Sequence, residues 1–158
     1  MRFSLFFIAI LAGCAATNPW KLESIATGEA LFDSARLTYS DTVTPLRFEI
    51  VRIESGIETF LSLTKYKFTT ANGIKIEFDI AGEKSEETVP FLEGKMRLRL
   101  PAELSERLIN ALQEGKEVAM IADGFEQHLN PDQFTTQYEK LAGKKAIFRN
   151  PFKGIFDP

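Results

Sequence analysis

Residues 65–80 read KYKFTTANGIKIEFDI and contain the clearest strand pattern in the chain. After Gly73, apolar residues alternate strictly with charged ones, which predicts a half-buried strand whose apolar face is Ile74, Ile76, Phe78 and Ile80. The Asn72-Gly73 pair favours a hairpin. A three-residue loop over 71–73 would pair Phe68 with Ile76 and Tyr66 with Phe78, with Gly73 in a left-handed conformation. We predict that hairpin because it gathers the large apolar groups on one face.

Strand patterns also precede this stretch. Residues 30–40 alternate imperfectly, and residues 56–70 form a strand pattern with a break in the middle as an alternative. Residues 45–53 alternate as far as Ile50 and change phase at Val51. A bulge, or burial of both faces, would produce such a change of phase.

Two segments follow the predicted hairpin. We interpret residues 81–88, AGEKSEET, as a charged turn. Residues 89–100 lead into a strand that alternates between apolar and basic side chains. Its inward positions are Met96, Leu98 and Leu100, and its outward positions are Lys95, Arg97 and Arg99.

The next segment, residues 101–115, has the pattern of an amphipathic helix. Pro101 suits the first turn, Gly115 suits the end, and a buried stripe is formed by Leu104, Leu108, Ile109, Ala111 and Leu112. After it, Asp123-Gly124 predicts a two-residue hairpin turn. That register pairs Ala122 with Phe125, Met120 with Gln127 and Val118 with Leu129, and sets His128 opposite Ala119.

Residues 130–143 carry the signals of a second helix. Asn130 is the expected cap, Pro131 the first helical residue, and Asp132 lies in the first turn. Gln133 is expected to reach back to the cap, the buried stripe is Phe134, Tyr138 and Leu141, and Gly143 is the expected end. Strands followed by helices predict an α+β fold: an antiparallel sheet or small β-sandwich with two amphipathic helices near the C-terminus.

The first 14 residues have a different character from the rest. Arg2 precedes an uncharged apolar run over residues 3–13, about half of the ~20 residues that a spanning helix needs. The run ends in LAGC, residues 11–14, and Cys14 is the only cysteine. This motif resembles the lipobox of bacterial lipoproteins. The resemblance implies cleavage before Cys14 and acylation of Cys14, and Ala15, rather than Asp, favours the outer membrane.

On this interpretation residues 1–13 are a cleaved signal peptide, 14–24 a short lipidated tether and 25–158 one globular domain. Several acyl chains on one residue would anchor the protein stably, whereas a single chain would not. Trp20 is expected to pack on the domain, with contact at the membrane interface as the alternative. The protein is predicted to face the periplasm from the outer membrane. Its net charge of -3 gives no basic surface for nucleic acid.

No catalytic or metal-binding pattern stands out in the sequence. With one cysteine and one histidine, His128, the chain has no Cys-rich or two-histidine metal motif, and it contains no Gly-x-Ser-x-Gly motif. His128 is expected to face solvent. The acidic residues Asp79, Glu83, Glu86 and Glu87 do not match a calcium loop, so we interpret them as a hydrated turn. We therefore predict no cofactor, no metal and no enzymatic activity.

The C-terminal tail, KKAIFRNPFKGIFDP, is unusually apolar for a chain end. One interpretation is that it folds back as a last strand or cover. The other is that Phe148, Phe152 and Phe156 contact another envelope protein. The predicted function is thus a lipid-anchored structural or interaction module. The alternative is a binder of small apolar ligands with a pocket lined by phenylalanines, or, less favoured, a hydrolase.

Overall fold

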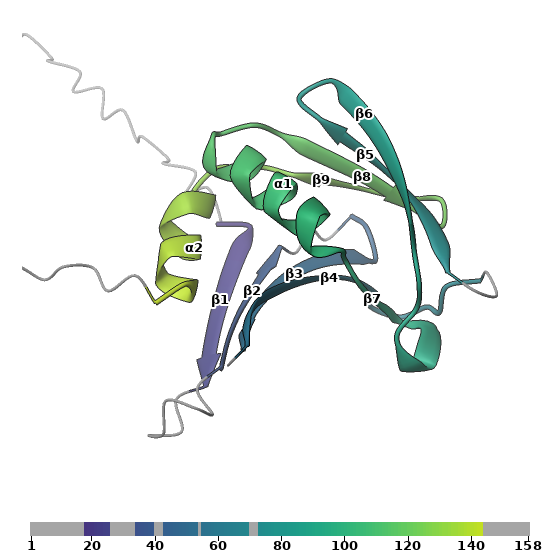
Figure 1. The fold of residues 1–158 in the computed structure, drawn as a ribbon, viewed down its shortest axis with the longest axis horizontal. Coiled ribbons are helices and arrows are strands. Elements are labelled where there is room, and N and C mark those ends of the chain that lie inside the picture. The colour runs from purple at the N-terminus through teal and green to yellow at the C-terminus, as the bar shows by residue number, and fades with distance from the viewer. Residues whose placement is uncertain (1–17, 26–33, 40–42, 54, 70–72, 144–158) are drawn as a thin grey trace, which may run out of the picture.

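The computed structural model describes residues 18–25, 34–39, 43–53, 55–69 and 73–143 (Figure 1). Within them the chain forms two antiparallel sheets, two α-helices and a short 3-10 turn, η1 (Glu93–Lys95). The fold is therefore α+β. Cys14 and the tail phenylalanines Phe148, Phe152 and Phe156 lie outside the described residues.

The first sheet has the strand order β1-β2-β3-β4-β7. Its strands are β1 (Trp20–Ile25), β2 (Ser34–Tyr39), β3 (Leu46–Ile53), β4 (Gly56–Leu63) and β7 (Arg97–Arg99). The second sheet has the order β6-β5-β8-β9, and its strands are β5 (Ile74–Ile80), β6 (Glu83–Val89), β8 (Val118–Ala122) and β9 (Phe125–Leu129). The helices are α1 (Ala102–Gln113) and α2 (Phe134–Leu141), which lie on either side of the β8–β9 hairpin in the chain.

Both sheets and both helices share one core. Its largest fully buried side chains include Trp20, Phe48, Phe78 and Phe134. Figure 1 shows α1 between the two sheets, where it packs against β4 and β8. The Thr59 and Ser105 hydroxyls join α1 to β4 through a buried 2.5 Å hydrogen bond, and Ser105 also donates to the Pro101 carbonyl. α2 packs against β1 and β2.

The predicted hairpin over residues 65–80 is wrong. β5 is joined to β6 by a two-residue turn, Ala81-Gly82, where both φ angles are positive, at 52° and 92°. This turn sets Phe78 opposite Ser85 and Ile76 opposite Glu87, and Asp79 accepts a 2.8 Å hydrogen bond from the Gly82 N–H. The charged segment 81–88 is therefore mostly edge strand and not a turn.

The apolar partners of β5 come from β8, 40 residues later in the chain. Phe78 lies opposite Met120, and Ile76 lies opposite Ala122. Residues 65–69 form no strand, although Phe68 is buried and its N–H donates to the Lys95 carbonyl. Gly73 does have a positive φ, 141°, as predicted, although it is not part of the predicted hairpin. A Cβ there would also lie 2.9 Å from the Val89 carbonyl oxygen.

The other strand predictions have mixed outcomes. β3 contains no bulge, because its register with β4 is continuous; burial of both faces explains the change of phase, since Phe48, Glu49 and Ile50 are all buried. Leu98 and Leu100 point inward as predicted. Met96 does not: it is 40% exposed because it ends η1 in a helical conformation and precedes β7.

The helix and second-hairpin predictions are largely confirmed. The β8–β9 register and the buried stripe of α1 agree with the predictions, and Gly115 follows α1 with φ 76°. The predicted cap of α2 is wrong. Asn130 instead accepts a hydrogen bond from the Asp132 N–H, Gln133 is left-handed, and the helix begins at Phe134.

The folded domain begins earlier than the predicted boundary at residue 25. Residues 20–25 form β1, which pairs with β2 along its whole length. Trp20 is 2% exposed and donates from its indole N–H to the Asn130 carbonyl at 2.8 Å. Residues 20–24 are thus part of the sheet, and packing, not contact with a membrane interface, accounts for Trp20.

Candidate functional site

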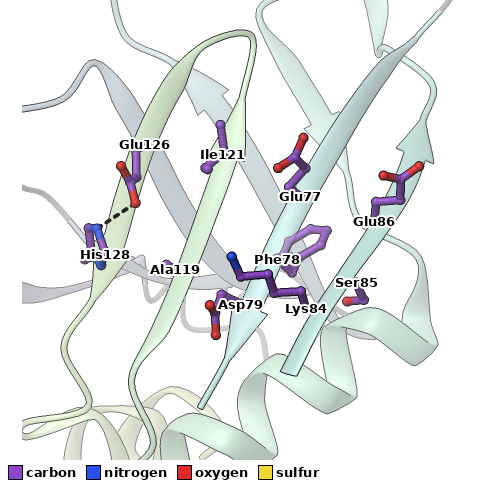
Figure 2. Close-up of a pocket in the computed structure, with 10 residues that line it drawn as sticks. All are labelled: Glu77, Phe78, Asp79, Lys84, Ser85, Glu86, Ala119, Ile121, Glu126 and His128. Carbon is purple, nitrogen blue, oxygen red and sulfur yellow. Dashed lines mark ion pairs between the residues drawn. The ribbon is translucent and has the colours of Figure 1, made fainter. Parts of the chain in front are cut away.

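A hollow of about 490 Å³ lies on the outer face of the second sheet (Figure 2). Two rows of outward side chains cross the four strands and line it. The first row is Glu86, Glu77, Ile121 and Glu126, and the second is Lys84, Asp79, Ala119 and His128. Directly opposite residues in such rows have Cβ atoms about 4.5–5.5 Å apart, so each row is a continuous line of neighbours.

The hollow exists because of the small and apolar residues on β8. Ala119 stands between Asp79 and His128, and its methyl group is much shorter than either neighbour. Ile121 stands between Glu77 and Glu126, and it is 38% exposed. The floor along β8 is therefore apolar, and the polar side chains of the flanking strands form its rim.

The rim is mainly acidic. Four carboxylates and one ammonium group line the hollow, together with His128. Glu86 forms an ion pair with Lys75 at 2.5 Å, whereas Glu77 forms no ion pair with any residue that the structure describes. The hollow thus suits a ligand that presents an apolar group to β8 and positive charge to the rim.

His128, the only histidine in the sequence, lies at the rim of the hollow. Its Nε2 lies 2.9 Å from Glu126 Oε1, and both side chains are more than half exposed, so this contact lies at the protein surface (Figure 2). His128 faces solvent, as predicted, from the edge strand β9. In the described ranges no group of three or more His, Cys, Asp and Glu side chains could hold a metal ion.

The four acidic residues that stand out in the sequence are divided by the structure. Asp79 and Glu86 line the hollow. Glu83 and Glu87 lie opposite Ile80 and Ile76, on the other face of β6. They are therefore not one cluster.

The outer face of the first sheet carries charges that are already paired. A hollow of about 270 Å³ there is bordered by Arg36 and Arg97, which pair with Glu23 at 2.6 Å and Glu49 at 3.0 Å. Hydrogen bonds from Lys21 and then from Arg36 lower the pKa of Glu23 to about 2. These groups neutralise one another, so we assign them a structural role.

A third surface, at the end of the molecule beside η1, combines apolar and basic residues. Tyr66, Leu92 and Met96 are its large exposed apolar side chains. The segments that carry them lie side by side, because Leu63 and Phe68 donate backbone hydrogen bonds to the Met96 and Lys95 carbonyls. The exposed cations nearby are Lys65, Lys67 and Lys95.

Half of the hollow could be predicted from the sequence. The β8–β9 register places Ala119, Ile121, Glu126 and His128 on one outer face, as its turn predicts. The alternation in residues 74–80 also predicts that Glu77 and Asp79 share the polar face of one strand. The sequence does not predict β6, because its residues are mostly charged and the Ala81-Gly82 turn before them is only a weak hairpin signal.

Comparison with models of protein families, with curated proteins and with solved structures found no match. Among the described residues, neither helix is long and apolar enough to cross a bilayer.

Proposed function

We propose that the protein is a membrane-anchored lipoprotein of the bacterial envelope that faces the periplasm and acts as a structural or protein-interaction module. The lipobox-like LAGC supports attachment through acylated Cys14, and Ala15 favours the outer membrane. β1 begins six residues after Cys14, so the tether is shorter than predicted and the domain is held close to the bilayer.

The position of the hollow is the observation that carries the interaction role. It lies on an open sheet face, its floor is apolar and its rim is charged, which are properties of a surface for a protein segment. We also propose that the two sheets form a small β-sandwich with α1 at its open side. Both sheets direct their apolar residues into one core, which supports this description.

The alternative, a binder of small apolar ligands, has less support. It requires a pocket lined by phenylalanines. Phe48, Phe78 and Phe134 are instead buried to within 1% and pack as core. Phe78 borders the hollow only from beneath, since its ring belongs to the inner face of β5 (Figure 2).

Photo-crosslinking in intact cells tests the interaction role. With a photoreactive amino acid in place of Ile121, we expect irradiation to give an adduct between the chain and one partner protein. The matched control carries the same group in place of Glu103, an exposed residue at the start of α1. The combined Glu77→Lys and Glu126→Lys variant should lose the adduct while unfolding in urea like the wild type. Equal adducts from both positions, or none from position 121, would contradict the proposal.

A further inference from the structure

We propose that the chain's own C-terminal segment, residues 144–158, docks in the hollow on the outer face of the second sheet and that a partner must displace it. This inference rests on the proposed function, because it names what occupies the same surface when no partner is bound. It assigns a role to Phe148, Phe152 and Phe156, the predicted partner contacts.

The C-terminal segment and the rest of the chain have opposite formal charges. Residues 144–158 carry four cations and one anion, a formal charge of +3, whereas residues 14–143 carry 14 cations and 21 anions, a formal charge of -7. The hollow carries part of this negative charge, since four carboxylates and one ammonium group line it and, within the described residues, only Glu86 among the carboxylates is paired with a lysine, Lys75. A basic segment is therefore attracted to this face, and the attraction is local because the Debye length is about 8 Å at physiological salt.

The order of side chains in the C-terminal segment also matches the hollow. Phe148 and Phe152 are each followed directly by a cation, Arg149 and Lys153. In the hollow the apolar Ile121 lies directly between Glu77 and Glu126. A phenylalanine ring placed on Ile121 would thus bring the next residue's positive charge within reach of a carboxylate.

The C-terminal segment is long enough to reach the hollow. The strand β9, which forms one side of the hollow, leads directly to α2, and α2 leads to the tail. The connection from Leu129 through the eight residues of α2 to Gly143 spans at most about 40 Å. Fifteen residues in extended form span about 50 Å, so residues 144–158 can return to the hollow.

The other exposed apolar surface has the wrong charge for this tail. Lys65 and Lys67 accompany Tyr66, Leu92 and Met96 there. Like charges disfavour a basic segment at that end of the molecule. The acidic hollow offers the tail both an apolar contact and charges of the opposite sign.

Docking within one chain is favoured over docking between chains. A short flexible connection gives an effective concentration in the millimolar range. A second copy reaches that concentration only where molecules are crowded. The isolated protein should therefore be a monomer whose tail covers Ile121, and partner binding should require displacement of the tail.

Crosslinking of the purified full chain in detergent tests this inference. With the photoreactive group at position 121, we expect an intramolecular crosslink to a peptide from residues 144–158, identified by mass spectrometry. Reversing two tail charges, Arg149→Glu with Lys153→Glu, should reduce the crosslink yield about tenfold. The control Lys140→Glu reverses an exposed charge on α2 and should leave the yield unchanged.

The outcomes of the two crosslinking experiments distinguish docking of the tail from the proposed function. Absence of the tail crosslink, or a crosslink that forms only between two copies, would overturn the inference. A tail crosslink that is insensitive to the charge reversals would overturn its electrostatic basis. A partner adduct in cells without a tail crosslink in the purified chain would leave the proposed function intact and contradict only this inference. A tail crosslink without a partner adduct would keep the docked tail but contradict the proposed function and, with it, displacement by a partner.

Discussion

Trp20→Ala is expected to lower the free energy of unfolding by about 3–5 kcal/mol, the cost of removing a large buried aromatic side chain. Trp20 is 2% exposed and joins β1 to α2. Its ring lies 4.8 Å from that of Tyr39 and 4.7 Å from that of Phe134, between ring centroids. Its indole N–H also satisfies the Asn130 carbonyl. Urea unfolding followed by circular dichroism measures the loss.

The control Trp20→Phe keeps an aromatic ring and removes the hydrogen bond, so we expect a cost of about 1–2 kcal/mol. This pair tests whether the domain begins at β1. If Trp20→Ala costs less than about 1 kcal/mol, residues 20–25 are not part of the cooperative fold, and the sequence-based boundary at residue 25 is the better one.

Arg97→Ala has the second largest expected effect, a loss of about 2–4 kcal/mol, because it leaves the buried carboxylate of Glu49 without its partner. Arg97 Nη2 lies 3.0 Å from Glu49 Oε2, and the Glu49 side chain is only 7% exposed. The guanidinium also lies over the Phe60 ring, 3.6 Å from its centroid. The range is below that of a fully buried pair because Arg97 itself is 38% exposed.

Arg99→Ala is the matched control, because Arg99 lies on the same strand and the same face. It pairs with Glu58, and its side chain is 58% exposed, so we expect a cost of at most about 1 kcal/mol. Urea unfolding of the two variants at one pH gives the comparison. Equal losses for Arg97→Ala and Arg99→Ala would show that burial of Glu49 has no special cost.

The two hairpins of the second sheet show what the sequence could and could not predict. At Asp123-Gly124 the turn residues and the apolar register agree, since both place Val118, Met120 and Leu129 inward, and the prediction is confirmed. At Asn72-Gly73 the same reasoning is wrong. The predicted hairpin requires the apolar face of β5 to pair with an apolar segment that is adjacent in the sequence.

β5 is a central strand, and this explains the error. Its apolar contacts come from β8, far along the chain, so its neighbour β6 can be charged and lie at the edge. Ala81 takes a positive φ, which is uncommon for alanine, so the turn carried little signal. The complete hollow could not be predicted from the sequence for the same reason. Glu77 lies beside Ile121 only because of the long-range β5–β8 pairing.

The two helices also differ in how well the sequence predicts them. The apolar stripe of α1 was predictable because burial follows the helical period. The start of α2 was not, because Asn130 can either cap a helix or form a local turn with the Asp132 N–H, and it does the latter. Local polar residues thus have alternatives that only the surrounding fold decides.

The proposed function depends first on Cys14, and incorporation of radiolabelled palmitate in growing cells tests that residue most directly. We expect the wild-type chain to incorporate the label and to be found in the outer-membrane fraction. We expect Cys14→Ser to lose the label and to leave that fraction. Label that persists in Cys14→Ser, or a wild-type chain that incorporates none, would contradict attachment through acylated Cys14.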